Sequence, residues 1–380
     1  MKIAFISNYL NHHQLPFCIE MCKKTNNEFY FIATQTISKE RLSLGYEDMN
    51  AKYPFVIETY KNNAEKQKAL EYAKKCDIVI IGSAPDEYIE ERLKENKITF
   101  RYSERIFKKE IWRIINPRII RNLYINHTRY KDKNLYMLCA SAYTAHDFSL
   151  ANAYIDKCYK WGYFPETQKY DIEQLMNNKE KNSKIQLLWV ARFIDWKHPE
   201  LPIKLAKWLK KQNYDFELQM IGCGPLLEKI KNKVVKEKMT DCVKILGAIK
   251  SSDVRKYMEN ANIFLITSDQ NEGWGAVVNE AMNSACVVIG NKKIGSIPFL
   301  IKDGKNGFTY SNQKEFFYRV KWIIENKEKQ RIIGKNAYST IINTWNAENA
   351  THNLIELCNS LLENRENTIE NGPCSKANIK

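Results

Sequence analysis

Two carboxylates and a run of glycines mark the stretch of this sequence best suited to chemistry. Glu272-Gly273-Trp274-Gly275 follows an apolar run at residues 263–267, and Glu280 stands eight positions after Glu272 in a helical pattern. Backbone amides at a helix start favour phosphate or sugar oxygens, and glycines let a ligand approach the backbone closely. We expect Glu272 in the loop and Glu280 in the helix to reach different hydroxyls of one extended ligand. A solvated helix face beside a tight turn would give the same spacing.

Two cations follow a second apolar run, residues 185–191, which predicts a strand. Arg192 offers a bidentate fork and Lys197 a mobile point charge, so together they can clamp a diphosphate, most strongly when it leaves and gains charge. The alternative is a solvated surface pair. A third feature, Gly222-Cys223-Gly224-Pro225, ends another apolar run. Its glycines permit a close backbone turn, which an ordinary strand-to-helix connection also needs.

The residues from Trp189 to Tyr310 resemble the retaining glycosyltransferases of family 4, which have the two-domain GT-B architecture. The resemblance covers about 120 residues, and the first 160 residues match only in general layout. The motifs that carry it, in chain order, are ARFIDWKHPE (191–200), LQMIGCGP (218–225), EGWGAVVNEAM (272–282) and GSIPFLIKDGKNGF (295–308).

This resemblance implies a role for each matching residue. Arg192 and Lys197 would bind the diphosphate of a nucleotide-sugar donor and stabilise its departing charge. Glu272, with the backbone after it, would hold the transferred sugar, and Glu280 would bind the ribose hydroxyls. The remaining donor-binding residues implied by the resemblance are Gly222, Gly247, Ala248, Ile249, Gly273, Trp274 and Gly275.

The resemblance implies neither a metal nor a cofactor, because basic residues and helix amides would neutralise the leaving diphosphate where other glycosyltransferases use a divalent ion. The sequence has no DxD motif after a strand of the kind that would hold such an ion.

The chain departs from the family in its first half. The loop at residues 7–17 lacks the paired glycines of many members and carries His12 and His13, which we assign to the acceptor side. Glu104 follows the run at 98–103, where many members have a histidine. It is a candidate catalytic residue that would contact the reacting sugar or the acceptor. The alternative is a plain salt bridge of Glu104 with Arg101, Arg105 or Lys108.

The elements that must position these residues alternate between short apolar runs and helical patterns, which predicts parallel strands with helical crossovers. The restart of this alternation at Ile185 predicts an α/β fold of two Rossmann-like doubly wound domains facing across a cleft. We predict an N-terminal acceptor-binding domain at 1–165 and a donor-binding domain at 166–345. A C-terminal helix at 346–363 can pack back on the first domain, and 364–380 is predicted to be a loose tail.

The charge balance is 59 Lys and Arg against 44 Asp and Glu, a formal +15, which predicts attraction to an anionic partner. Residues 101–133 contain ten basic and three acidic residues. Within them, residues 106–125 combine cations with apolar residues at helical spacing, which is typical of a helix on an anionic membrane surface. A core-facing amphipathic helix with a basic outer face is the alternative. No apolar run approaches the roughly 18 residues that span a bilayer, so we expect a cytoplasmic protein, peripheral on the inner face of the membrane.

Together these features predict a hexosyltransferase that moves a sugar from a nucleoside-diphosphate sugar to a glycan or lipid-linked acceptor with retention, in cell-surface polysaccharide biosynthesis. A nucleotide-sugar epimerase or hydrolase of the same fold is the alternative enzyme, with His12, His13 and Glu104 as its acid and base groups. A nucleic-acid-binding protein is the alternative from another class, but the sequence has no motif typical of one. We therefore expect no nucleic-acid partner.

Overall fold

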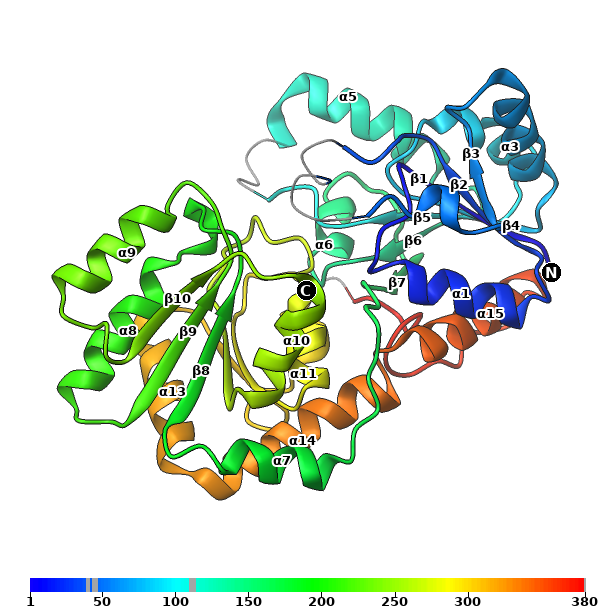
Figure 1. Cartoon of the computed structure of the whole chain (residues 1–380). Coiled ribbons are helices and arrows are strands. Elements are labelled where there is room, and N and C mark those ends of the chain that lie inside the picture. Colours follow the sequence, from blue (N-terminus) through cyan, green and yellow to red (C-terminus); the bar gives the residue numbers. More distant parts are fainter. Residues whose placement is uncertain (39–41, 43–46, 109–113, 379–380) are drawn as a thin grey trace. The chain divides into compact units, whose positions relative to one another are not determined.

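The computed structural model describes residues 1–38, 42, 47–108 and 114–378 (Figure 1). The chain divides into two compact units. Unit 1 comprises Met1–Glu166 and Thr344–Lys380, and unit 2 comprises Thr167–Asn343.

The core of unit 1 is a parallel sheet with the strand order β3-β2-β1-β4-β5-β6-β7. Its central strands are buried on both faces, which explains why their sequences are continuous apolar runs and do not alternate with polar residues. The order reverses between β1 and β4, so the chain leaves these two strands in opposite directions at their carboxyl ends. The strands are β1 (Ile3–Ser7), β2 (Phe29–Ala33), β3 (Val56–Glu58), β4 (Ile78–Ile81), β5 (Thr99–Ser103), β6 (Leu135–Cys139) and β7 (Cys158–Lys160).

Helices cover this sheet, and the last helix of the chain, α15, packs beside the first, α1 (Figure 1). The α15 residues Leu354, Leu357 and Cys358 are fully buried, so the C-terminal segment completes the core of unit 1. The helices of unit 1 are α1 (Leu15–Lys24), α3 (Asn63–Lys75), α4 (Glu90–Lys94), α5 (Pro117–Asn126), α6 (Thr144–Ser149) and α15 (Ala347–Leu362).

Unit 2 repeats this plan with the parallel strand order β10-β9-β8-β11-β12-β13. Its strands are β8 (Ile185–Val190), β9 (Phe216–Ile221), β10 (Val243–Gly247), β11 (Ile263–Ile266), β12 (Val287–Asn291) and β13 (Phe308–Tyr310). Its helices are α7 (Ile172–Glu180), α8 (Glu200–Lys211), α9 (Leu227–Lys236), α10 (Ser251–Asn260), α11 (Val277–Asn283), α12 (Ile297–Leu300), α13 (Gln313–Glu325) and α14 (Lys327–Asn343). The reversal falls between β8 and β11, as it falls between β1 and β4 in unit 1.

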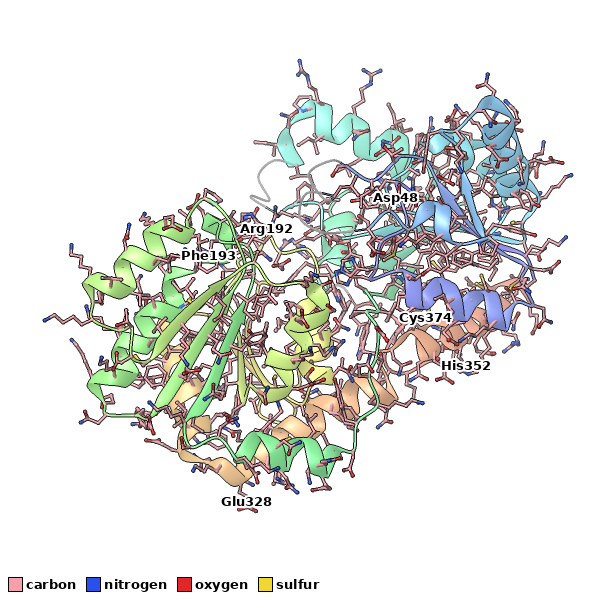
Figure 2. The ribbon with its side chains drawn as sticks, viewed as in Figure 1. Asp48, Arg192, Phe193, Glu328, His352 and Cys374 are labelled. Carbon is pink, nitrogen blue, oxygen red and sulfur yellow. The ribbon has the colours of Figure 1, made fainter. Side chains whose placement is uncertain are left out.

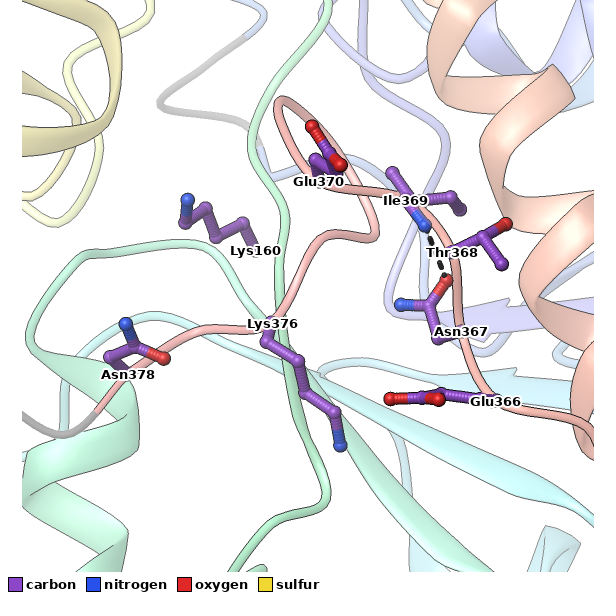
Figure 3. A pocket seen from close by; sticks show the side chains of 8 residues that line it. All are labelled: Lys160, Glu366, Asn367, Thr368, Ile369, Glu370, Lys376 and Asn378. Carbon is purple, nitrogen blue, oxygen red and sulfur yellow. Dashed lines mark hydrogen bonds between the residues drawn. The ribbon is translucent and has the colours of Figure 1, made fainter.

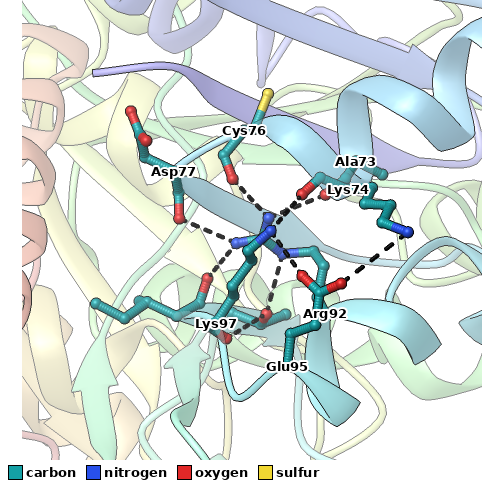
Figure 4. Close-up of polar contacts among 9 residues, drawn as sticks. Ala73, Lys74, Cys76, Asp77, Arg92, Glu95 and Lys97 are labelled. Atoms are coloured by element: carbon teal, nitrogen blue, oxygen red, sulfur yellow. Dashed lines mark hydrogen bonds and ion pairs between the residues drawn. The ribbon is translucent and has the colours of Figure 1, made fainter.

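Each unit buries a cation at the end of one helix. In unit 1 the Arg92 guanidinium donates to the backbone carbonyls of Ala73 (3.0 Å), Cys76 (2.6 Å), Asp77 (3.0 Å) and Ile98 (2.8 Å), and Arg92 is 0% exposed (Figure 4). Three of these carbonyls lie at or just after the C-terminus of α3. The Ala73 carbonyl is among the helix-end groups that have no partner inside the helix, and the Cys76 and Asp77 carbonyls lie just beyond it. Burial lowers the pKa of Arg92 to about 10.

The corresponding cation of unit 2 is Lys179 in α7. Its ammonium donates to the carbonyls of Met258 (2.8 Å) and Ala261, at the end of α10. Burial lowers the pKa of Lys179. Both α3 and α10 lead into the strand on the far side of the reversal, so the two capped helix ends are equivalent. The cations themselves come from different elements, because α4 follows β4 whereas α7 precedes β8.

The helical pattern of residues 145–157 predicts a longer helix than the structure has. Helix α6 ends at Ser149, because Asn152, Tyr154 and Asp156 all have positive φ (51°, 57° and 58°) that no helix tolerates.

The predicted loose tail also packs in the structure. Cys374 is 0% exposed, its N–H donates to the carbonyl of Lys160 in β7 (2.7 Å), and the Lys160 N–H donates to the carbonyl of Ser375 (2.8 Å). This segment therefore runs antiparallel along β7 and adds backbone pairing to the edge of the sheet.

Candidate functional site

The loops after β8 and β11 carry the main candidate site of unit 2. These two strands are hydrogen-bonded neighbours at the reversal of strand order, where parallel α/β sheets bind ligands outside their carboxyl ends. Lys197 closes a short 3-10 turn, Asp195–Lys197, in the first loop. Glu272 lies in the second loop, before α11.

The structure brings Lys197 and Glu272 together as an ion pair. The side chains are 13% and 12% exposed, so the pair is largely shielded from water but reachable. Ser268 donates its hydroxyl to the same carboxylate oxygen of Glu272 (2.9 Å). The Lys197 ammonium also lies 4.3 Å from the centre of the Trp196 ring, within range of a cation–π interaction. One cation and one carboxylate are thus held in fixed positions at the ends of adjacent strands.

A buried chain of hydrogen bonds holds the two loops together. The Trp189 indole N–H donates to the Thr267 hydroxyl (2.9 Å), which donates to the carbonyl of Lys197 (2.6 Å). Trp189 and Thr267 are each 1% exposed. The Asp269 N–H donates to the Trp196 carbonyl (3.0 Å). The backbone around Lys197 is therefore fixed to the loop that carries Glu272.

His198 adds a titratable link between the same loops. It has a left-handed backbone conformation (φ 50°), and its ring nitrogens lie 3.4 Å from Glu200 and 3.3 Å from Asp269. The hydrogen bond with Glu200, and then the nearby carboxylate charges, raise the pKa of His198, and the same hydrogen bond lowers the pKa of Glu200. The protonated imidazole thus holds α8 and the loop after β11 together.

Arg192, the second predicted phosphate ligand, is exposed at the end of β8 (Figure 2). The next residue, Phe193, is 0% exposed and anchors the loop, because its N–H donates to the carbonyl of Cys223 (2.8 Å). A Cβ at Gly222 would lie 1.9 Å from the Ala191 carbonyl oxygen, and Gly222 has φ 140°. Gly222 is therefore required for the close approach of the β9 turn to the Arg192 loop.

The turn between Glu272 and α11 depends on a buried tryptophan. Trp274 is 0% exposed, and its indole N–H donates to Asn279 (2.9 Å), so its side chain belongs to the core. Gly275 has φ 82°, and a Cβ there would meet the Glu272 Cγ at 3.2 Å. Gly273 is buried between them. In this stretch only backbone groups remain available to a ligand.

Glu280 lies in the first turn of α11. Burial raises the pKa of its carboxyl group, and the charge of Arg255 in α10 opposes that rise. The Arg255 guanidinium donates to the Glu280 carbonyl (3.3 Å) and to the Asn283 side chain (3.0 Å). Within the described residues, no recorded hydrogen bond or ion pair joins Glu280 to Lys197 or Glu272.

The predicted donor-binding residues Gly247, Ala248 and Ile249 lie at the end of β10 and just after it. Gly247 has φ 73° with open space at its Cβ position, and its carbonyl accepts from the Gly222 N–H (2.7 Å). Ala248 is exposed and Ile249 is half-buried, so this turn presents backbone and small side chains to solvent.

In unit 1 the three predicted residues meet through a tyrosine. The Tyr163 hydroxyl donates to Glu104 (2.9 Å), and the Lys108 ammonium donates to the other carboxylate oxygen of Glu104 (2.6 Å). The His13 ring stacks on Tyr163 with the ring centres 6.0 Å apart, and the His12 ring centre lies 3.7 Å from that of His13. Of the three salt bridges considered for Glu104, the structure forms the one with Lys108.

Several neighbours of these residues were not predicted from the sequence. Ser268, Thr267 and Trp196 lie within five residues of Lys197 or Glu272, so their polar or aromatic side chains beside a predicted site were the available signal. Tyr163 is 59 residues from Glu104 and carries no such signal.

A cavity of about 500 Å³ in unit 1 includes none of the predicted site residues (Figure 3). It lies between the end of β7 and the C-terminal segment. Its lining is formed by Lys160, Glu366, Asn367, Thr368, Ile369, Glu370, Lys376 and Asn378. Across the described part of the chain, no cluster of three or more His, Cys, Asp and Glu side chains is arranged to hold a metal ion.

Comparison with known proteins gives a family match within the second unit. Residues 171–340 match the family of glycosyl transferases group 1. The matched range lies inside unit 2 and contains the Lys197–Glu272 pair. Part of the chain is 28% identical over 151 residues to an uncharacterized glycosyltransferase of Methanocaldococcus jannaschii, covering 39% of this chain and 41% of that protein. Another part is 30% identical over 129 residues to the amylovoran biosynthesis glycosyltransferase AmsK of Erwinia amylovora, covering 33% and 31%. The chain thus spans less than half of the length of these two relatives.

The fold of the whole chain has solved counterparts. The crystal structure of HepE from Anabaena in complex with UDP superposes with a TM-score of 0.69 at 15% identity, covering 95% of this chain and 100% of that chain. Another structure of HepE is in complex with UDP-glucose. This likeness confirms the predicted fold class of two Rossmann-like parallel α/β domains. The described helices include none that is both long and apolar enough to cross a membrane.

Proposed function

We propose that this protein is a glycosyltransferase that transfers a sugar from a nucleoside-diphosphate sugar to a glycan or lipid-linked acceptor in cell-surface polysaccharide biosynthesis. The Lys197–Glu272 ion pair, with Arg192 on the same loop as Lys197, is the observation that carries the proposal. The group 1 match over unit 2 and the relative AmsK support the reaction class. Retention at the anomeric carbon and membership of family 4 are part of this proposal.

The donor would bind on unit 2 by replacing the internal ion pair with two ligand contacts. Lys197 and Arg192 would move from Glu272 and from solvent onto the diphosphate, and Glu272 would accept from a hydroxyl of the sugar. Glu280 would bind the ribose hydroxyls through its carboxyl group, whose pKa is raised by burial.

Catalysis in this proposal rests on charge stabilisation. As the bond between the sugar and the diphosphate breaks, negative charge gathers on the leaving phosphate. Two fixed cations in a largely shielded site stabilise that charge most in the transition state. The acceptor hydroxyl would attack from the face that the diphosphate leaves and would give its proton to a leaving phosphate oxygen. Neither step needs a metal ion, and we propose that the enzyme works without one.

The Glu104–Tyr163–His13 cluster of unit 1 is the proposed acceptor side. Aromatic and imidazole rings provide flat surfaces for sugar rings, and the Glu104 carboxylate, which pairs with Lys108, can accept from an acceptor hydroxyl.

The first test is thermal stabilisation by a panel of UDP- and GDP-sugars with EDTA present. UDP-glucose is tested first, because HepE binds it. We expect one nucleotide series to stabilise the wild type and Lys197→Ala to abolish that effect. Lys204→Ala is the matched control, since it removes an exposed lysine of α8 in the same unit.

The outcomes separate the competing functions. If no nucleotide sugar stabilises the wild type, the donor site is wrong. If stabilisation requires a divalent ion, the metal-free part of the proposal is wrong. Release of free nucleoside diphosphate at full rate without any acceptor, or an epimerised donor, would replace the transferase with a hydrolase or an epimerase.

A further inference from the structure

Helix α5 of unit 1 exposes large apolar side chains on its outer side. Ile120 and Tyr124, four residues apart on one face of the helix, are 50% and 58% exposed, and Ile115 just before the helix is 71% exposed. Leu123 and Ile119 on the adjoining face pack against the core of unit 1 and fix the helix in place. Figure 1 shows α5 at the periphery of its unit.

Among the described residues, no acid neutralises the cations of α5. Arg118 and Arg121 are exposed on the next faces of the helix, and within the described residues neither makes an ion pair. Helix α3 of the same unit contrasts with this, because its lysines Lys66, Lys68 and Lys75 all pair with glutamates. The α5 surface, defined as Ile115, Arg118, Ile120, Arg121 and Tyr124, therefore combines exposed apolar area with unpaired positive charge.

We propose that the α5 surface docks unit 1 onto an anionic lipid bilayer. A helix with apolar side chains beside arginines can place the former among the acyl chains and the latter among phosphate headgroups. Tyrosine is a residue that membrane interfaces favour, because its ring is apolar and its hydroxyl is polar. Between residues 114 and 133 there are five basic residues and one acidic residue, so the charge complements an anionic surface.

The predicted membrane segment was 106–125, and its residues 109–113 lie outside the described part of the chain. The proposal rests only on residues 115–124. It goes beyond the donor chemistry of unit 2 and does not depend on it.

Helix α9 of unit 2 provides a matched control. It exposes two cations, Lys229 and Lys236, as α5 does, but its exposed apolar residue, Val235, has no exposed apolar partner on the same face. Replacing two cations of either helix by glutamate changes the net charge equally. A difference in vesicle binding between the two charge variants therefore reports on the α5 surface and not on the net charge of the protein.

The experiment is vesicle flotation of the full-length protein, with phosphatidylcholine vesicles and with vesicles containing about a quarter phosphatidylglycerol. We expect the wild type to float only with the anionic vesicles. Ile120→Glu with Tyr124→Glu should weaken the partition coefficient by about tenfold or more. Arg118→Glu with Arg121→Glu should weaken it similarly, while Lys229→Glu with Lys236→Glu should change it less than about threefold.

Three results would overturn the proposal. Equal losses from the α5 and α9 charge variants would show attraction by net charge alone. A wild-type dimer in size-exclusion chromatography that Ile120→Glu dissociates would assign the surface to a second copy of the chain. Release of the protein from vesicles by substoichiometric RNA or DNA would assign it to nucleic acid.

Failure here is distinguishable from failure of the proposed function. The α5 variants should keep the wild-type melting temperature and the wild-type stabilisation by nucleotide sugar, because α5 belongs to unit 1 and the donor residues to unit 2. If the variant of Ile120 and Tyr124 lacks a melting transition, it is misfolded, and the single substitution Tyr124→Ser is then tested in its place.

Discussion

The loops after the first strand of each unit occupy the same position in the same strand order, yet they differ in chemistry. After β8 the loop carries Arg192 and Lys197, and the latter pairs with Glu272. After β1 the loop carries His12 and His13, whose ring centres lie 3.7 Å apart, and the His13 ring stacks on Tyr163. The topology therefore determines where a ligand meets each sheet, and the loop residues determine its kind. Under the proposed function, the charges of unit 2 suit a diphosphate and the rings of unit 1 suit a sugar.

Both units also bind the end of one helix with a buried cation. Arg92 and Lys179 each bind the end of the helix that leads into the strand beyond the reversal. Since both cations are buried without a carboxylate in hydrogen-bond contact among the described residues, their partners are backbone carbonyls. We infer that this position needs a buried donor in both units because the helix end leaves its carbonyls unpaired.

The comparison of loops predicts its largest effect at the ion pair of unit 2. Lys197→Ala should weaken binding of the nucleoside diphosphate by about a hundredfold, because a largely shielded cation is removed from the diphosphate site. Glu272→Gln should not weaken binding of the nucleoside diphosphate and can strengthen it, because the carboxylate that competes for Lys197 is gone. The same variant should weaken binding of the nucleotide sugar, because its contact with the sugar is lost. Isothermal titration calorimetry with both ligands measures this.

The control for this prediction is Lys204→Ala, which should bind both ligands like the wild type. If Glu272→Gln weakens the diphosphate and the nucleotide sugar equally, the separate roles assigned to Lys197 and Glu272 are incorrect.

Substitution of the buried cations Arg92 and Lys179 tests how much each contributes to the free energy of unfolding of its unit. Arg92→Met leaves several buried carbonyls unpaired and should destabilise unit 1 by about 3 kcal/mol. Lys179→Met frees fewer carbonyls and should destabilise unit 2 by about 2 kcal/mol. Chemical denaturation followed by circular dichroism gives the free energies of unfolding.

Hydrogen exchange then assigns each loss to a unit. Exchange should accelerate in β4 for Arg92→Met and in β11 for Lys179→Met. An equal increase of the exchange rate in both strands, for either variant, would contradict the idea that each cation stabilises its own unit. Arg92→Lys is the conservative control and should fall between the wild type and Arg92→Met, since one ammonium cannot reach all the carbonyls.

A smaller effect is expected at the ring cluster of unit 1. Tyr163→Phe removes the hydroxyl that holds Glu104 while keeping the ring on His13, so the KM for the acceptor should rise by about tenfold with the donor KM unchanged. Glu104→Gln keeps the shape and loses the charge, and should act in the same direction. Steady-state kinetics with both substrates checks this, and a rise in the donor KM instead would contradict the assignment of the rings to the acceptor.

The sequence allowed the fold to be predicted where burial is strong. The apolar runs of β1, β8 and β11 identified those strands, and the motif around Glu272 identified the residue that pairs with Lys197. Short edge strands such as β3 and β7 were missed, because three residues give no periodic signal and their order comes from pairing with neighbours. The tail was predicted to be loose because its sequence is polar, and its pairing with β7 leaves no pattern in the sequence.

Contacts that depend on loop conformation could not be predicted either. Ser268 and Trp196 reach the ion pair only because the 3-10 turn and the left-handed His198 fold the first loop back on the second. Tyr163 reaches Glu104 from a segment far along the chain. Such contacts follow from tertiary packing, which no local pattern records.

The smallest effect is expected from the pH dependence of the link at His198. Its folded-state pKa is raised, mainly by Glu200 in α8 and also by Asp269 in the loop after β11. The link is therefore fully present below the ordinary histidine pKa of about 6.5 and is lost as the pH rises through the raised value. Since the link holds the Lys197 loop, affinity for the nucleoside diphosphate should fall by about threefold between pH 6 and pH 9. His198→Gln should remove this pH dependence and bind at the weaker, high-pH level throughout. Calorimetric titrations across that range test the prediction, and an NMR titration of the His198 ring gives its pKa. A wild-type affinity that is flat with pH while the ring titrates normally would show that the loops of unit 2 are held by the Trp189–Thr267 chain alone.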